Sequence, residues 1–244
     1  MPKFFIKRED IDGDTVVVRG DNQNHIKNVF RFKVGDEILL CDGEGTDYKV
    51  KISSQTHDYS ETKILEVNKA NSEPSVNITL YQGVPKATKL ELIIQKNVEL
   101  GINKIVPVMC ERTIVRFNNQ KDIQKKVERW QKIAKEASKQ SGRGIIPEVR
   151  SPITLKEAIN NAKEYDLAII PYEKEHYNTL KDVLSNNRNA KNICVFIGPE
   201  GGFSEQEIEL CNKNNIIPIT LGNRILRTET ASMYTTSIIM YELD

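Results

Sequence analysis

The sequence has no long apolar run, and this absence excludes membrane-spanning classes of protein. Of its 244 residues, 39% are hydrophobic and 28% are charged, which is ordinary for a globular protein. No apolar run approaches the roughly 18 residues that a transmembrane helix needs. The N-terminus, MPKFFIKRED, has no sustained apolar segment and no small-residue cleavage site, so it does not look like a signal peptide. We therefore expect a cytoplasmic protein with no membrane partner.

Paired cysteines and clustered histidines are also missing. The chain has four cysteines and three histidines, but no two cysteines form a CxxC pair and no histidine lies at a metal-ligand spacing from them. These residues are Cys41, Cys110, Cys194 and Cys211, with His25, His57 and His176. The sequence predicts reduced cysteines in the core and no metal.

The common phosphate-binding signatures are absent as well, and the net charge is only +1. Neither GxxxxGK[ST] nor GxGxxG occurs. One segment is nevertheless strongly basic: residues 121–143 contain eight Lys or Arg against three Asp or Glu. This segment is a candidate surface for phosphates, although a solvated helix face is the ordinary explanation of a lysine-rich helix.

Residues 1–71 are predicted to form a β-rich domain. Alternating or β-branched runs at 15–20, 36–43, 48–54 and 62–67 are separated by turn signals, a spacing typical of a small barrel. The polar stretch NKANSEPS at 68–75 is predicted to be a linker.

Residues 72–244 are predicted to form an α/β domain with a mainly parallel sheet, because strand and helix patterns alternate. The long helix at 122–140 carries an apolar stripe of Val127, Trp130, Ala134 and Ala137. Strands are predicted at 76–83, 103–110, 166–170, 192–198 and 216–222, and further helices at 89–100, about 205–215 and 230–243.

The stretch IGPEGGFSEQEIE at 197–209 is an unusual strand-to-helix junction. Ser204 and Glu207 form a capping-box pattern, so a helix is predicted to begin at about Glu205. A tight turn would explain the glycines but not the carboxylate of Glu200 among them. That carboxylate would repel a pyrophosphate, so we expect a phosphate-free, cationic, nucleotide-like ligand at the strand end.

A second unusual junction, LGNRILRTETAS at 221–232, crowds Arg224, Arg227 and Glu229 at the start of the last helix. A charged, solvated turn with an acceptor near the helix N-terminus is the alternative explanation. A third junction, Pro171-Tyr172-Glu173, follows another predicted strand.

Together, these junctions closely resemble the RsmE family of 16S ribosomal RNA methyltransferases. Supporting segments are HIKNVFRFKVGDEILLCDG (25–43), IQKNVELGINKIVPV (94–108), ERTIV (111–115), RWQKIAKEASKQSGR (129–143) and IPEV (146–149). The resemblance implies an N-terminal PUA-like β-barrel and a C-terminal SPOUT methyltransferase domain with a deep trefoil knot. It further implies a homodimer that uses S-adenosyl-L-methionine to methylate N3 of a uridine in the decoding region of 16S ribosomal RNA, within the assembled small ribosomal subunit.

The resemblance also assigns residues to the cofactor, and in an RNA enzyme the basic helix and nearby basic residues become candidate phosphate contacts. Cofactor contacts are expected from Tyr172, Glu173, Ile197, Gly198, Pro199, Glu200, Gly201, Gly202, Leu221, Gly222, Ile225, Leu226, Arg227 and Thr230. RNA contacts are expected from Arg31, Lys33, Arg129, Lys132, Lys135, Lys139 and Arg143.

Two arginines are the candidate catalytic residues. Uracil N3 must lose its proton before it attacks a methyl group, so the developing anion needs a positive partner. Arg227 is the first candidate because it lies in a cofactor loop and remains charged at any working pH, and Arg143 is the second. Glu200 and Glu229 are considered as bases, but structural roles are favoured for both, and water is an equal alternative.

Two other functions remain open on the sequence. One is a SPOUT methyltransferase that acts on transfer RNA or on another ribosomal nucleotide. The other is an RNA-binding ribosome assembly factor that has lost catalysis, although the intact GPEGG and ILRTETA segments argue against it.

Overall fold

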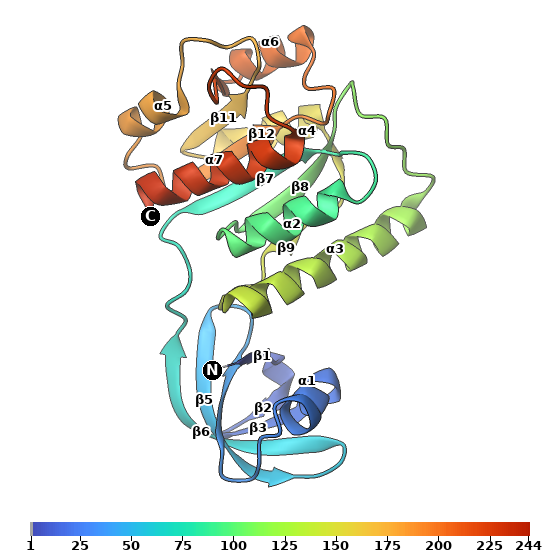
Figure 1. Ribbon diagram of the computed structural model, residues 1–244, viewed down its shortest axis with the longest axis vertical. Coiled ribbons are helices and arrows are strands. Elements are labelled where there is room, and N and C mark those ends of the chain that lie inside the picture. The colour runs from blue at the N-terminus through green and yellow to red at the C-terminus, as the bar shows by residue number, and fades with distance from the viewer. Residues whose placement is uncertain (1) are drawn as a thin grey trace. The chain divides into compact units, whose positions relative to one another are not determined.

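The computed structural model describes residues 2–244, which form two compact units (Figure 1). Unit 1 contains the residues through Glu73 together with Ser138–Ile146, and unit 2 contains Pro74–Ala137 and Pro147–Asp244. The sequence analysis placed the boundary between its two domains at residues 71 and 72. The segment Ser138–Ile146 belongs to unit 1, although the sequence analysis assigned it to the second domain.

Unit 1 is built on a six-stranded sheet with the order β1-β4-β5-β6-β3-β2. Among the described residues of this sheet, β1 and β4 are the one parallel pair, and the long β5–β6 pairing contains two register shifts. Phe4, Val16, Ile26, Ile38 and Val50 belong to the apolar cluster of this unit. The elements are β1 (Lys3–Phe5), β2 (Ile11–Asp12), β3 (Thr15–Arg19), α1 (Gly20–Asn24), β4 (Glu37–Cys41), β5 (Thr46–Gln55) and β6 (Tyr59–Lys69), with short non-α helical turns at Arg8–Asp10 and His25–Val29.

The predicted linker at 68–75 is only partly correct. Strand β6 continues to Lys69, and the largely buried carboxylate of Glu73 is bound by the segment Ser138–Ile146. One Glu73 oxygen accepts hydrogen bonds from the backbone N–H groups of Gly144 (2.8 Å) and Ile145 (3.1 Å), and the other lies 2.6 Å from the Arg143 guanidinium. Glu73 therefore fixes the end of this part of unit 1, although its polar surroundings in the sequence predict a linker.

Unit 2 contains a parallel sheet with the order β10-β8-β7-β12-β11-β13, and β9 also pairs with β8. The central pair is β7 and β12, with Gln82 opposite Ile197 at their carboxyl ends. Its elements are β7 (Asn77–Gly83), α2 (Lys89–Glu99), β8 (Lys104–Met109), α3 (Gln120–Ser141, whose last residues belong to unit 1), β9 (Glu148–Val149), β10 (Ile153–Thr154), α4 (Leu155–Asn161), β11 (Leu167–Pro171), α5 (Leu180–Asn186), β12 (Asn192–Ile197), α6 (Glu205–Lys213), β13 (Ile217–Ile219) and α7 (Thr228–Leu243), with a short 3-10 turn at Ala162–Glu164.

Helices cover both faces of this sheet, so its strands are apolar on both sides. Alternate residues of β12 show the two layers: Ile193 and Val195 pack in the cluster formed with α2, α3, α5 and α7, whereas Cys194 and Phe196 pack with α4 and α6. Figure 1 shows α7 lying beside α2. Trp130, Ala134 and Ala137 of α3 are buried in the first cluster and Val127 packs against it, which confirms the predicted stripe.

The main strands and helices agree with their predicted positions, and α6 begins at Glu205 with the predicted capping box. The sequence analysis missed the short helices α1, α4 and α5 and the two-residue strands β2, β9 and β10. Helices of five to seven residues carry too few turns to display an apolar period.

Candidate functional site

A cavity of about 660 Å³ lies at the carboxyl ends of β11, β12 and β13 in unit 2. It is formed by the segments that follow these three neighbouring strands, together with the first residues of α2 and α7. Its lining residues are Lys89, Pro171, Tyr172, Glu173, Glu175, His176, Ile197, Gly198, Pro199, Glu200, Gly201, Gly202, Phe203, Thr220, Leu221, Gly222, Asn223, Arg224, Ile225, Leu226, Arg227, Thr228 and Ala231. The predicted junctions therefore meet in one pocket.

The glycine-rich segment 198–202 forms one wall and leaves its backbone bare. A β-carbon added to Gly198 would lie 3.1 Å from the α-carbon of Gly202, and one added to Gly201 would lie 3.1 Å from the β-carbon of Arg112. Gly202 adopts φ +66°, in the left-handed region that favours glycine. The Arg112 guanidinium donates to the Gly201 carbonyl at 2.8 Å and so holds the outer side of this wall.

Gly83, at the end of β7, packs closely against Gly198 and Pro199 of the same wall. A β-carbon there would lie 2.5 Å from Cδ and 2.6 Å from the nitrogen of Pro199. Such contacts are far inside van der Waals distance, so only glycine allows β7 and the segment after β12 to approach this closely. Gly83 was not singled out in the sequence, because its requirement comes from a residue more than a hundred positions away.

Glu200, whose carboxylate the sequence left unexplained, is bound by the start of α2. Its oxygens accept from the backbone N–H of Lys86 (3.1 and 3.3 Å), and one lies 3.2 Å from the Lys89 ammonium. Partial burial acts to raise the pKa of Glu200, but hydrogen bonds from backbone N–H groups and the nearby Lys89 outweigh it and lower the pKa below its ordinary value. Glu200 is thus an ionised structural anchor.

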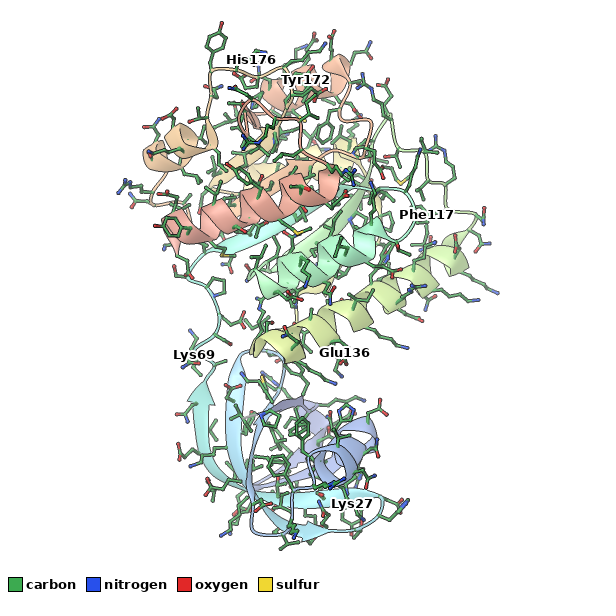
Figure 2. All side chains as sticks on the ribbon, in the orientation of Figure 1. Lys27, Lys69, Phe117, Glu136, Tyr172 and His176 are labelled. Carbon is green, nitrogen blue, oxygen red and sulfur yellow. The ribbon has the colours of Figure 1, made fainter. Side chains whose placement is uncertain are left out.

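The segment after β11 forms a second wall. The Glu175 carboxylate accepts from the backbone N–H groups of His176, Tyr177 and Asn178 at 2.7–3.1 Å, and these bonds lower the pKa of Glu175. Asn178 in turn accepts from the backbone N–H of Thr220 at 2.8 Å. Figure 2 shows Tyr172 and His176 on this segment. The carboxylate of Glu173 faces Gly202, because a β-carbon there would lie 3.5 Å from both Glu173 oxygens.

The segment 220–228 forms the third wall and supplies two exposed arginines to the pocket, Arg224 and Arg227. Within residues 2–244, the Arg227 side chain has no hydrogen-bond or ion-pair partner, so its guanidinium is available to a ligand. Ile225 is 88% exposed at the same wall. Of the expected cofactor contacts, all line the cavity except Thr230, which is exposed on α7; Thr228, one half-turn earlier, lies there instead.

Arg143 is placed away from this pocket. It belongs to unit 1, its side chain is only 3% exposed, and its guanidinium pairs with Glu73. A guanidinium engaged in this way stabilises the fold and is not presented to a substrate. This geometry offers no support for the catalytic and RNA-contacting roles suggested for Arg143, which stay predictions.

The other candidate RNA contacts are mostly at the surface. Arg31 and Lys33 are exposed in unit 1, and Arg31 adopts a left-handed backbone with φ +58°. On α3, Lys132 and Lys135 are exposed and Lys139 is half-buried. Arg129 is 65% exposed and lies 2.8 Å from a carboxylate oxygen of Glu91, a pair that water screens.

The cysteines are all free and buried, as the sequence predicts. Burial raises the pKa of the Cys41 and Cys211 thiols to about 12, so neither is a nucleophile near neutral pH. Within residues 2–244 no group of three or more His, Cys, Asp or Glu side chains is arranged to hold a metal ion. No helix in the same range has both the length and the apolar character for crossing a membrane.

Comparisons with known proteins agree with this picture. The family profile described as "RNA methyltransferase domain" matches residues 71–240, and the one described as "RNA methyltransferase PUA domain" matches residues 18–65. The chain is 32% identical to "Ribosomal RNA small subunit methyltransferase E" of Bacillus subtilis (strain 168), covering 100% of this chain and 98% of the relative. It is 33% identical to the protein of the same name from Mesomycoplasma hyopneumoniae (strain 232), covering 96% of each.

A solved structure shows the same likeness in three dimensions. The crystal structure of a ribosomal RNA small subunit methyltransferase E from Neisseria gonorrhoeae, bound to S-adenosyl methionine, superposes with a TM-score of 0.87 at 32% identity. The match covers 99% of this chain and 97% of that one.

Proposed function

Because this chain belongs to the ribosomal RNA small subunit methyltransferase E family, we propose that it transfers a methyl group from S-adenosyl-L-methionine to N3 of a uridine in 16S ribosomal RNA. The observation that carries the proposal is the cavity of about 660 Å³ at the ends of three parallel strands, in the domain that matches the methyltransferase profile. The assembled small ribosomal subunit, at its decoding region, is the proposed substrate, and the cytoplasm is the proposed location.

The pocket fits the proposed cofactor in size and chemistry. Its volume lies within the roughly 300–1,000 Å³ range of small-molecule sites. The bare backbone at 198–202 lets a flat ring approach closely, and Glu173 and Glu175 suit a ligand with positive charge. No phosphate-binding signature is present, in keeping with a phosphate-free adenosine derivative.

The bound cofactor supplies an electrophilic methyl group on a sulfonium. The residues of this chain orient it and stabilise the attacking uracil, whose N3 carries negative charge once its proton has left. We propose that the Arg227 guanidinium pairs with O2 or O4 of that uracil, because it lines the pocket and has no internal partner within residues 2–244.

The proton of N3 passes to water in this proposal. Glu200 is held by Lys86 and Lys89, and an oxygen of Glu229 is buried 3.5 Å from the Lys89 ammonium. A carboxylate engaged in this way is a poor acceptor for a substrate proton. Solvent reaches the pocket through its exposed wall at Ile225.

We further propose that the RNA contacts basic side chains of both units, most of which are exposed. Arg31 and Lys33 of unit 1, with Arg129, Lys132, Lys135 and Lys139 of α3, would bind phosphates and so position the substrate without selecting its bases. Replacing Lys132 or Lys135 by Gln should reduce the slope of log affinity against log salt concentration by about one per contact. An unchanged slope would remove the residue from the interface.

The knotted SPOUT topology and the homodimer belong to the same proposal. Exposed apolar side chains on α2 and α7, Leu92, Tyr234 and Tyr241, support a subunit interface on these helices. Sedimentation equilibrium would test the dimer directly.

The decisive experiment is mass-spectrometric mapping of 16S ribosomal RNA from cells that lack this protein. We expect one N3-methyluridine to be missing and to return when the native gene is supplied. If every N3-methyluridine stayed in place, and a transfer RNA lost one instead, the enzyme would belong to the alternative substrate class.

Arg227→Ala should lower kcat by about 100-fold, the scale expected when a group that stabilises transition-state charge is removed. Arg227→Lys retains the charge but not the two-pronged geometry, and should recover part of the rate. Single-turnover methylation of purified small subunits measures the effect. A native rate in Arg227→Ala would exclude the proposed role.

A further inference from the structure

Gln82, the penultimate residue of β7, is fully buried and lies between two walls of the pocket without lining it. Its amide nitrogen is 2.9 Å from the Gly83 carbonyl, 2.9 Å from the Thr228 hydroxyl and 3.5 Å from the Gly198 carbonyl. Gly198 begins the glycine wall and Thr228 begins α7. One side chain thus contacts both segments, which are 30 residues apart in the chain.

The carbonyls of Gly83 and Gly198 determine the orientations of the Gln82 amide and the Thr228 hydroxyl. Carbonyl oxygens only accept, so the NH₂ group of Gln82 must face Gly83 and Gly198. Thr228 donates its proton to the Gly198 carbonyl at 2.6 Å and must therefore accept from Gln82. The hydrogen bonds therefore run in one direction: Gln82 donates to Thr228, and Thr228 donates to the Gly198 carbonyl.

The first residues after β7 contact the same two walls at the surface. The backbone N–H of Lys86 donates to Glu200 of the glycine wall, and the Lys89 ammonium lies 3.2 Å from Glu200 and 3.5 Å from Glu229 of α7. Water and salt partly screen the Lys89–Glu200 pair, whose side chains are 36% and 29% exposed, whereas the contacts of the fully buried Gln82 are screened much less.

We propose that Gln82 is a positioning residue for cofactor binding: through Thr228 it fixes the Gly198 carbonyl, and with it the spacing between the glycine wall and the start of α7. The ligand in this statement rests on the proposed function. Neither partner of the hydrogen bond carries out chemistry. Their effect is on affinity, because a pocket held in its binding geometry does not spend binding energy on ordering its walls.

Matched variants of the full chain test this role. Thr228→Val keeps the shape of the side chain but removes the hydroxyl, and Thr228→Ser retains the hydroxyl. Gln82→Met keeps the length but removes both donors. We expect the Kd for S-adenosyl-L-methionine, measured by calorimetry, to rise about 10-fold in Thr228→Val and Gln82→Met, and to stay within about 3-fold in Thr228→Ser.

Steady-state kinetics and a double variant separate positioning from stability. In Gln82→Met, whose changed side chain does not line the pocket, the KM for S-adenosyl-L-methionine should rise in parallel with Kd while kcat at saturation stays within about 3-fold. The double variant, Gln82→Met with Thr228→Val, should bind S-adenosyl-L-methionine no more weakly than the single variant with the higher Kd. Both changes break the same chain of hydrogen bonds, so their effects should not add. A lower melting temperature with native Kd and KM would show that the residues only stabilise the fold, and would overturn the proposal.

Amide hydrogen exchange in the ligand-free protein gives a second measurement that does not depend on the cofactor. The Gly202 N–H donates to the Pro199 carbonyl at 2.9 Å within the glycine wall. Its exchange should accelerate about 10-fold in Thr228→Val but not in Thr228→Ser. Equal exchange in both would contradict the proposal even if the native protein failed to bind S-adenosyl-L-methionine, a result that would by itself refute only the proposed function.

Discussion

At the scale of single residues, the Glu73–Arg143 pair shows how burial changes the role of a charge. Both side chains are largely enclosed, at 12% and 3% exposed, and Glu73 also accepts from two backbone N–H groups. Breaking one partner of such a pair leaves the other charge buried without compensation. The segment Ser138–Ile146 is thereby fixed to the rest of unit 1.

Glu73→Gln should lower the free energy of unfolding by about 3 kcal/mol at neutral pH. Burial acts to raise the pKa of Glu73, but Arg143 and the N–H groups of Ile145 and Gly144 hold it below its ordinary 4.5. Because the pKa is lower in the folded state, the native carboxylate stabilises the fold above pH about 4.5, and this stability is lost as the pH falls through the folded value. Urea unfolding of both proteins from pH 7 to pH 3 should show the difference shrinking in acid.

The matched control is Glu242→Gln. Glu242 is exposed on α7, and its side chain has no hydrogen bond or ion pair within residues 2–244. The Glu242→Gln substitution should leave the midpoint of urea unfolding unchanged from pH 7 to pH 3. A constant difference between Glu73→Gln and the native protein down to pH 3 would refute the pH linkage.

Gly83→Ala should impair both stability and cofactor binding, because the added methyl would lie 2.5 Å from Pro199. The backbone of the glycine wall must move to accommodate it, and overpacking of this kind costs about 1–3 kcal/mol. We expect the Kd for S-adenosyl-L-methionine to rise at least 10-fold by calorimetry. Gly13→Ala is the control: its φ of +58° brings strain, but nothing lies within 4 Å of the added methyl, so only stability should fall.

At the scale of elements, the start of α6 is a case where local sequence was sufficient. Ser204 accepts from the Glu207 N–H, and Glu207 reaches back to the Ser204 N–H at 2.9 Å. The structure adds two contacts from outside the helix: the Ser204 hydroxyl donates to the Glu111 carboxylate at 2.7 Å, and the Glu111 backbone N–H donates to the Glu207 carboxylate at 2.8 Å. These contacts connect the helix to the segment that follows β8.

Ser204→Ala should therefore lower the free energy of unfolding by about 1–2 kcal/mol, the upper range for loss of an N-cap. Ser204→Thr retains the hydroxyl and should recover most of the loss. Thermal unfolding followed by circular dichroism compares the three proteins. Equal melting temperatures for Ser204→Ala and the native protein would show that backbone and water replace the cap.

At the scale of the whole molecule, the chain passes between its two units three times, at residues 73, 137 and 146. Segment Ser138–Ile146 packs closely in unit 1: a β-carbon on Gly144 would lie 2.1 Å from that of Ala70, and one on Gly43 would lie 3.0 Å from Ile146. A small domain depends strongly on each part of its core. Unit 1 is thus completed by the end of α3 and the segment that follows it, residues Ser138–Ile146.

A fragment of residues 1–73 should therefore fail to reach the stability that unit 1 has in the intact chain. Without Ser138–Ile146, the Glu73 carboxylate has lost its partners and Ile146 no longer covers Gly43. We expect circular dichroism and amide exchange to show a largely unprotected fragment, and protection to rise when a peptide of residues 138–146 is added. A fragment that is fully protected alone would refute this dependence.

The sequence by itself determined the alternating strands and helices, the cap of α6, the apolar stripe of α3 and the three junctions that form the pocket. These follow from local periodicity and from residue types at fixed short spacings, which neighbours along the chain are sufficient to specify. The family resemblance, now confirmed, also came from short contiguous motifs.

Only the tertiary structure decided which partners Gln82, Gly83, Thr228, Glu200 and Arg143 contact. Each of these partners lies between 30 and more than a hundred positions away along the chain. Such pairings arise when strands β7 and β12 are brought side by side and when Ser138–Ile146 joins unit 1. A linear pattern does not record which distant residue fills the space beside a glycine or neutralises a buried charge, so these roles appear only once the chain is folded.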